Sequence, residues 1–248
     1  MFRSTAVRAL GVAALIVVAT GVTGCLDSVI TEHGSGDLET RDYEVGEFTS
    51  IEAHRALRVN VTVDPNAEAS VTVTMDDNLF EFLEIRTSGH TLVLDADRNL
   101  DPADDAVVEV VTKALGDIET SGAVSLQVTG TVTGDGIELH ASGASRIRID
   151  EIDAGNVALG ASGASRITID GGTTADIDGE ASGASSLDLE GVTGEDADLD
   201  ISGASHAEVR VTGNVDGGAS GASSVTVHGD PASVDVSTSG ASNVSLRP

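Results

Sequence analysis

One four-residue string, Ser-Gly-Ala-Ser, recurs through the second half of the chain and constrains its fold more than any other feature. A degenerate copy, Ser-Gly-Ala-Val, begins at Ser121 and is followed by exact copies that begin at Ser142, Ser162, Ser182, Ser202, Ser220 and Ser239. The first interval between starts is the longest, three equal intervals follow, and the last two are slightly shorter. Self-similarity at a period of about 20 residues is typical of stacked repeat architectures.

Each repeat has the pattern of two short strands. Ile147 and Ile149 alternate with polar residues, and so do Val157 and Leu159, which follow the turn-like segment Asp153–Gly155. Alternation of this kind predicts strands that bury one face. We therefore expect every coil to contain two strands and two bends.

The parity of the repeat predicts which residues point inward. The common interval is even, so the apolar inward set keeps odd numbers: Ile147, Ile149, Val157, Leu159, Ile167, Ile169, Ile177, Leu187, Leu189, Leu199, Ile201, Val209, Val211, Val225 and Val227. The first and last intervals are odd, so the inward residues have even numbers at both ends of the repeat array. These are Leu126 and Val128 in the first copy and Val244 and Leu246 in the last copy. Because a one-residue slip exchanges the faces of a strand, the odd residue is predicted to lie in a bend or bulge.

These observations predict an all-β fold, a right-handed parallel β-helix (β-solenoid) with roughly 20-residue coils. No repeat has enough apolar residues for a core of its own, but stacked coils about 4.8 Å apart bury a continuous one. Right-handed connections are the usual ones between parallel strands. The corner glycines are expected to serve as structural turns with positive φ; they are Gly122, Gly143, Gly163, Gly183, Gly203, Gly221 and Gly240. No repeated histidine accompanies the serines as a catalytic base would, so the motif is interpreted as structural.

The composition excludes one class of partner. The chain has 41 acidic and 13 basic residues, a formal charge of −28, and 2% aromatic residues with no Trp. This excludes a basic nucleic-acid surface and argues against a carbohydrate cleft built on aromatic platforms. The charge fits either a protein that works in high salt or an ordinary acidic secreted protein.

The N-terminal sequence predicts that the protein is located at the cell envelope. Arg3 and Arg8 precede the apolar stretch Ala9–Val22, which is shorter than the about 20 residues of a membrane span and fits a signal peptide over residues 1–24. Val22–Cys25 resembles the lipobox of prokaryotic lipoproteins, which implies a lipid on Cys25, the single cysteine. The expected location is extracytoplasmic, lipid-anchored to the cell membrane. The alternative is a plain signal peptide with an incidental cysteine.

The rest of the chain divides at changes of pattern. Polar residues 25–41 are predicted to be a tether and residues 42–248 a β-helix domain, irregular over 42–120 and regular over 121–248. The irregular part is expected to cap one end of the core. Its predicted strands are Phe48–Ala53, Ala56–Val63, Ser70–Thr74, Thr91–Leu94 and Ala106–Thr112. Asp76–Asn78 could cap a short helix over Leu79–Leu83.

Residues 42–248 resemble the head GIN domain family, also described as auto-transporter adhesin heads and as a domain of unknown function. The resemblance rests on Ser50–Arg98 with its DDNL segment at Asp76–Leu79 and its GHTLVL strand at Gly89–Leu94, followed by the SGAS repeats. It implies a right-handed parallel β-helix in the cell envelope. It implies no catalytic residues.

Charged residues are predicted to align in columns. Asp178 and Asp198 are expected in one outward column and Glu180 and Asp200 in another, about 5 Å apart. Oxygen-rich sites suit calcium, which makes these four weak metal candidates. The Gly-Gly-x-Gly-x-Asp calcium repeat is missing from the sequence, so diffuse counterions are the favoured reading and no metal or other cofactor is expected.

The histidines and arginines carry weaker signals. None of the six histidines has a metal-ligand spacing such as His-x₃-His, and they are interpreted as isolated surface residues. Arg146 and Arg166 are expected in one outward column with Arg148 on the same face. Such a basic column is compatible with a polysaccharide lyase but is more typical of a solvated face.

The function expected from these features is non-enzymatic. A lipid-anchored envelope protein would present its β-helix as an interaction or adhesin-like surface for an envelope protein or glycan that the sequence does not identify. Two alternatives stay open. A polysaccharide-active enzyme would need an insertion-walled groove over Arg146, Arg166 and Asp170, and a structural spacer would have no specific partner.

Overall fold

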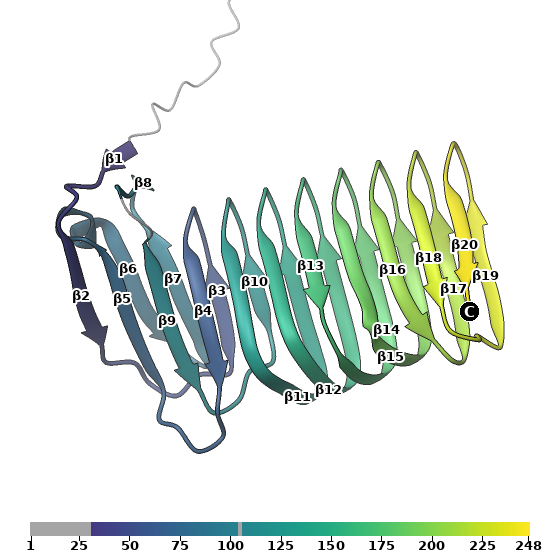
Figure 1. Ribbon diagram of the computed structural model, residues 1–248, viewed down its shortest axis with the longest axis horizontal. Helices are drawn as coiled ribbons and strands as arrows, with labels where there is room; N and C mark the ends of the chain where they lie inside the picture. Colours follow the sequence, from purple (N-terminus) through teal and green to yellow (C-terminus); the bar gives the residue numbers. More distant parts are fainter. Residues whose placement is uncertain (1–30, 104–105) are drawn as a thin grey trace, which may run out of the picture.

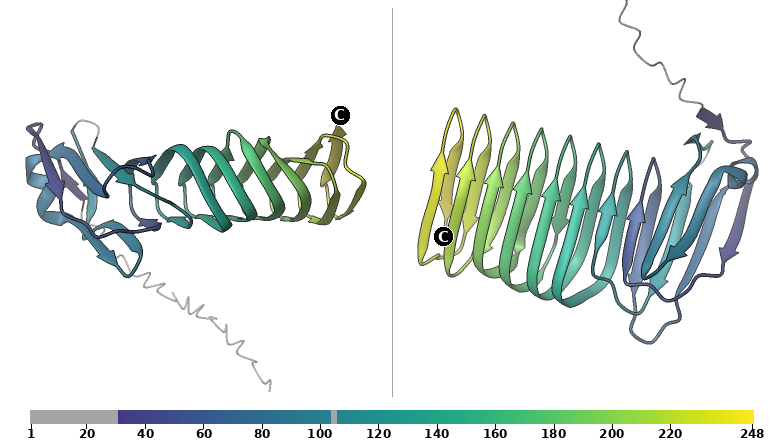
Figure 2. Two further views of the ribbon diagram at one scale, coloured as in Figure 1. Left: turned by 90° about the horizontal axis from the view of Figure 1, so that it is seen from below. Right: turned by 180° about the vertical axis from the view of Figure 1, so that it is seen from behind.

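The chain from Ile118 onward is a β-solenoid of stacked parallel coils. The computed structural model describes residues 31–103 and 106–248 (Figure 1). Each coil crosses two parallel sheets, which meet at a narrow corner on one edge and a rounded bend on the other, and all corners form one row (Figures 1 and 2). The Ser-Gly-Ala-Ser motifs form the corners.

The strands of the solenoid pair in parallel, and their register shifts only in two of the bends. Three of them continue through the bend, namely β11 (Ser125–Ala141), β12 (Arg146–Ala161) and β15 (Ser186–Ile201). The other strands cover one side of a coil each: β10 (Ile118–Thr120), β13 (Arg166–Ile169), β14 (Gly172–Ala181), β16 (His206–Val211), β17 (Asn214–Ala219), β18 (Ser224–His228), β19 (Ser233–Thr238) and β20 (Asn243–Arg247). The β-helix predicted from the repeat is confirmed here.

The predicted inward set forms the core. Ile147, Ile167 and Leu187 pair in register and are at most 1% exposed. The other odd-numbered apolar residues predicted to point inward are buried as well. Val244 is only half-buried and Leu246 is 59% exposed; both lie on β20, the last strand of the described solenoid.

Changes in coil length are absorbed in the bends, on the edge opposite the corners. The extra residue of the first, longest repeat lies between Val128 and Thr131, where Gly130 has φ +103°. The second irregularity lies between Leu189 and Thr193. The bulge expected for the first repeat is therefore present, and the corners stay aligned.

The corner repeats because its atoms contact their equivalents in the neighbouring coil. The seven predicted turn glycines have φ between 73° and 84°. A Cβ on six of them would lie 2.5 or 2.6 Å from the carbonyl oxygen of the equivalent glycine one coil earlier. For the seventh, Gly122, the nearest oxygen is the carbonyl of Arg55, which is the one non-glycine residue of the described chain with positive φ. The final serine of each exact copy except the last is buried, as at Ser165, whose hydroxyl donates to the carbonyls of Ala141 (2.9 Å) and Ser162 (2.8 Å).

The N-terminal part extends both sheets but is partly antiparallel. One sheet continues through β4 (Arg58–Val63), β9 (Val107–Thr112), β5 (Ser70–Asp76) and β2 (Leu38–Tyr43), and the other through β3 (Ser50–Ala53), β7 (Thr91–Ala96) and β6 (Leu83–Ser88). β5 is antiparallel to β2 and β9, and β6 to β7. The expectation of a parallel β-helix over all of residues 42–248 is wrong here. The reason is visible at Gly89 and His90, because a two-residue connection can join only antiparallel strands.

Part of the predicted tether belongs to the fold. β1 (Thr31–His33) pairs with β8 (Asn99–Asp101), and β2 lies on β5 with Arg41 4.1 Å above the ring of Phe80. The sequence carries no signal for these strands, because an exposed edge strand needs backbone pairing and no apolar face.

Asp76 has a different role from the one predicted. The helix it precedes is a 3₁₀ helix, η1 (Asp77–Phe82), and the Asp76 side chain does not cap it. Its buried carboxylate instead accepts hydrogen bonds from the amides of Gly36 (2.6 Å) and Ala103 (3.0 Å), which satisfies a charge that would be costly to bury alone.

Candidate functional site

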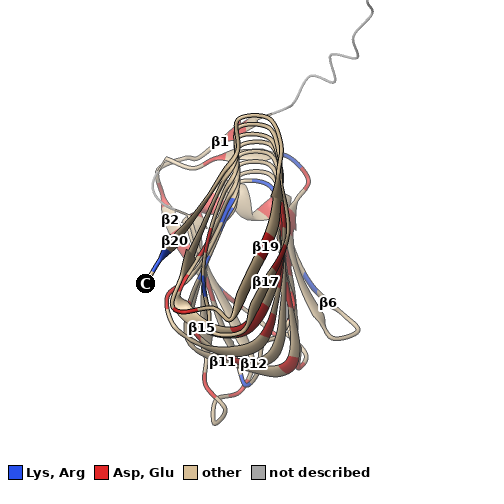
Figure 3. Ribbon diagram, turned by 90° about the vertical axis from the view of Figure 1, so that its right-hand side faces the viewer, with Lys and Arg blue, Asp and Glu red and all other residues tan. Residues whose placement is uncertain are grey.

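The two sheets of the solenoid carry different charge. We call one the acidic face; it comprises the outward side chains of β10, β14, β17 and β19 and of the parts of β11, β12 and β15 that follow the bend. Its carboxylates are Glu119, Glu138, Asp176, Asp178, Glu180, Asp196, Asp198, Asp200, Asp216 and Asp235, and these strand segments contain no Lys or Arg. Figure 3 shows Asp and Glu on β17 and β19.

The opposite sheet, which we call the mixed face, holds all the basic residues of the regular coils. They are Arg146, Arg148, Arg166, Arg210 and Arg247. Arg146 pairs in register with Arg166, as the sequence predicts. Two acids on this face lie beside arginines: Asp170 is 2.8 Å from Arg148, and Glu190 is 3.8 Å from Arg210.

Acids on the acidic face stack on one another instead. Asp178 pairs in register with Asp198 and Glu180 with Asp200, which confirms the predicted columns. The first column continues from Asp198 to Asp216 and on to Asp235. Neighbours in such a column are about 4.8 Å apart, and like charges at this spacing repel each other, so the face attracts cations and cationic groups.

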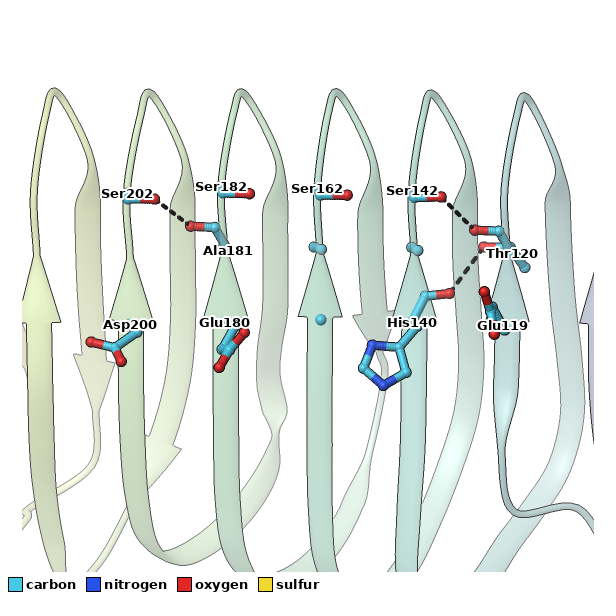
Figure 4. Close-up of a pocket in the computed structure, with 13 residues that line it drawn as sticks. Glu119, Thr120, His140, Ser142, Ser162, Glu180, Ala181, Ser182, Asp200 and Ser202 are labelled. Atoms are coloured by element: carbon cyan, nitrogen blue, oxygen red, sulfur yellow. Dashed lines mark hydrogen bonds between the residues drawn. The ribbon is translucent and has the colours of Figure 1, made fainter.

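A shallow groove runs along the acidic face just below the corners (Figure 4). It has a volume of about 680 Å³ and is lined on one side by the column Glu119, His140, Glu180 and Asp200 and on the other by the first serines of the corners. Gly160, which also lines the groove, makes room for the ring of His140, because a Cβ at this position would overlap that ring. The groove offers hydroxyls, carboxylates and one imidazole to a polar ligand.

A second cluster lies on the mixed face and joins three successive coils. His228 of β18 is 7% exposed, and its Nε2 donates to Oε1 of Glu208 in β16 at 2.6 Å. His206 Nε2 lies 3.6 Å from Oε2 of the same carboxylate, and His228 Nδ1 lies 3.8 Å from Oε1 of Glu190 in β15. The hydrogen bond from His228, with a smaller contribution from His206, holds the pKa of Glu208 below its usual range.

The interpretation of the histidines as isolated surface residues is therefore wrong for His206 and His228. The contact of His228 is missed because the spacing between histidines carries no information about Glu208, which lies 20 residues earlier on the neighbouring strand. Writing the coils in register would have placed Glu208 beside both histidines.

The residues predicted as metal or lipid sites are different from those of the cluster that the structure shows. In the described part of the chain, one group of three His, Asp, Glu or Cys side chains has ligand atoms within 4.8 Å of one another. It consists of Glu190, Glu208 and His228. The weak candidates Asp178, Asp198, Glu180 and Asp200 lie in their columns outside this group, and the expectation that they attract diffuse counterions stays a prediction. Cys25 lies outside the described residues. No helix in the described part of the chain is long and apolar enough to cross a membrane.

Stacked parallel coils, a mixed β cap at one end and corners of identical small residues define the class of protein as a capped β-solenoid. The chain belongs to the family described as "Putative auto-transporter adhesin, head GIN domain", which matches residues 47–231. No curated protein matches the chain.

Solved structures share the fold at low sequence identity. A "putative adhesin" from Bacteroides fragilis is 17% identical with a TM-score of 0.80, over 87% of this chain and 99% of that one. One from Parabacteroides distasonis is 18% identical with a TM-score of 0.69, over 88% and 100%. A "putative lipid binding protein" from P. distasonis is 17% identical with a TM-score of 0.64, over 87% and 99%. The family and these neighbours are consistent with an adhesin-like surface outside the cytoplasm.

Proposed function

We propose that this protein is held at the cell membrane by a lipid on Cys25 and presents its β-solenoid as a non-enzymatic, adhesin-like interaction surface. The acidic face is the contact surface, and its partner is an envelope protein or glycan that displays cationic groups. The observation that carries the proposal is the separation of charge, with every Lys and Arg of the regular coils on the other face.

A rigid surface fits this role better than a catalytic cleft does. The coils differ by at most three residues in length, so no long insertion rises beside Arg146 and Arg166. Asp170, which a lyase-like groove would include, is paired with Arg148 at 2.8 Å. A spacer without a partner would gain nothing from keeping one face free of basic residues, because unrelieved repulsion within that face opposes folding.

The experiment compares two variants of equal charge. The full chain is used to capture partners from solubilised envelope fractions, as wild type, as Asp178→Asn/Asp198→Asn/Asp216→Asn on the acidic face, and as Asp135→Asn/Asp153→Asn/Asp230→Asn in the bends. The proposal expects the acidic-face variant to lose its captured protein or glycan and the bend variant to keep it. Equal capture by both variants contradicts it.

The anchor has its own test. Cys25→Ser should leave the membrane fraction and appear in the soluble extracytoplasmic fraction, because the variant lacks the thiol that carries the proposed lipid. Wild-type behaviour of this variant would show that another attachment holds the protein.

A further inference from the structure

We propose that Glu190, Glu208 and His228, with His206 as a fourth ligand, form a binding site for a divalent transition metal of the Zn²⁺ class. The proposal is independent of the adhesin-like surface, since the site lies on the mixed face. It rests on Glu190, Glu208 and His228 of the successive strands β15, β16 and β18, whose ligand atoms lie within 4.8 Å of one another. His206 lies beside them, with its Nε2 3.6 Å from Oε2 of Glu208.

The two distances from the histidines to Glu208 are close to those between ligands of one metal ion. Zn²⁺ binds imidazole nitrogen and carboxylate oxygen at about 2.0–2.2 Å, which places ligand atoms of a tetrahedral site about 3.3 Å from one another. His228 Nε2 and Glu208 Oε1 are 2.6 Å apart and share a proton, and a metal in place of that proton needs them to separate by less than an ångström. His206 Nε2 and Glu208 Oε2 are 3.6 Å apart, within the range that a rotation of either side chain closes.

The orientation of His206 favours the same conclusion. Its Nδ1 is hydrogen-bonded to the hydroxyl of Ser224 at 2.7 Å, which leaves Nε2 directed at Glu208. Metal-binding histidines are held in this way, with the second ring nitrogen bound to a neighbouring polar group. His228 is held by burial, at 7% exposure, so little ordering is required when the ion binds.

Charge balance also fits a divalent ion. Glu190 and Glu208 supply two negative charges, and two neutral imidazoles complete the set that Zn²⁺ and similar ions prefer. Two cations oppose binding: Arg210, whose Nη2 lies 3.8 Å from Glu190, and Arg247, which pairs in register with His228. The hydrogen bond of Arg210 goes to the backbone, from its Nε to the carbonyl of Glu190 at 2.9 Å, so the carboxylate can turn to a metal without breaking it.

A calcium ion is not the expected ligand. Ca²⁺ takes six to eight oxygen ligands, whereas half of the side chains here are imidazoles. A bound transition metal would tie β15, β16 and β18 together where the coil becomes two residues shorter.

The test measures binding of ZnCl₂ and CaCl₂ to the full, chelator-treated chain by calorimetry, with the thermal midpoint as a second readout. We expect one Zn²⁺ per chain, a higher midpoint with Zn²⁺ than with Ca²⁺ at the same concentration, and a Kd at least tenfold weaker in Glu208→Gln and in His206→Ala. His206 is partly exposed, so His206→Ala separates lost ligation from lost folding. His140→Ala, on the acidic face, is the matched control and should bind as wild type does.

Three outcomes would overturn the proposal. The first is no saturable Zn²⁺ binding, and the second is equal stabilisation by Ca²⁺ and Zn²⁺, which would indicate general screening of the acidic chain. The third is retention of wild-type affinity in Glu208→Gln together with its loss in His140→Ala, which would place the ion on the other face.

Discussion

A Cβ atom on Gly163 would lie 2.6 Å from the carbonyl oxygen of Gly143, the equivalent glycine of the preceding coil. The same oxygen accepts the amide of Ala164 at 2.7 Å, so it cannot move away without losing a hydrogen bond. Gly163 also has φ +76°. The corner therefore requires glycine for two independent reasons, a left-handed backbone and a close approach between coils.

Gly163→Ala should lower the free energy of unfolding by about 2 kcal/mol or more, since the left-handed conformation alone costs a residue with a Cβ about 1–2 kcal/mol. Gly136→Ala is the control, because its Cβ would meet no atom within 4 Å and its φ is not positive. We expect its effect to stay within about 0.5 kcal/mol. Urea unfolding followed by circular dichroism measures both, and equal effects would contradict the role of the corner.

Alanine substitutions of the two serines of one motif should lower the free energy of unfolding by different amounts. Ser165→Ala removes a buried hydroxyl that donates to two carbonyls, those of Ala141 and Ser162, and should cost about 1–2 kcal/mol. Ser162→Ala, in the same corner, removes a half-exposed hydroxyl and should cost less than about 0.5 kcal/mol. The same unfolding curves decide this, and a larger cost at Ser162 would reverse the assignment.

A charged side chain placed in the core should destabilise the fold severely. Ile167 is 0% exposed and lies in register between Ile147 and Leu187, so Ile167→Asp buries a carboxylate with no partner and should cost more than about 4 kcal/mol. Thr168→Asp is the matched control, because the adjacent side chain points outward and is half-buried. Thermal melts should show a large loss for the first variant and a small change for the second. An unchanged midpoint in Ile167→Asp would refute the inward assignment.

Salt should stabilise the protein by screening the acidic face. The Debye length falls from about 10 Å at 0.1 M to about 3 Å at 1 M, below the spacing of the carboxylate columns. Asp198→Asn, between Asp178 and Asp216, should raise the midpoint at low salt and reduce its dependence on NaCl. Asp230→Asn, exposed in a bend, removes the same charge outside the columns and should do less. If the two variants respond alike, the columns do not matter and only net charge does.

The candidate cluster at Glu208 shows where reasoning from the repeat is incomplete. His206 and His228 occupy different positions of their coils, so the period alone separates them. Glu208 joins them because side chains in a parallel sheet also reach diagonally across neighbouring strands. The coil here is two residues shorter than its predecessors, so Glu208 pairs with Thr226 and reaches His228 diagonally instead of lying directly opposite it.

The sequence by itself determined the coil, its inward residues and its glycine corners, because period and parity act locally and each coil repeats the same contacts with the next. The tertiary structure alone decided the antiparallel cap, the strands within the predicted tether and the partners of Asp76. Those features join segments that do not share the repeat: Gly36 and Ala103 are distant from Asp76 in the chain, and only folding brings their amides to its carboxylate. It also decided that the charges separate onto two faces, since a residue's face depends on which side of the bend its strand lies.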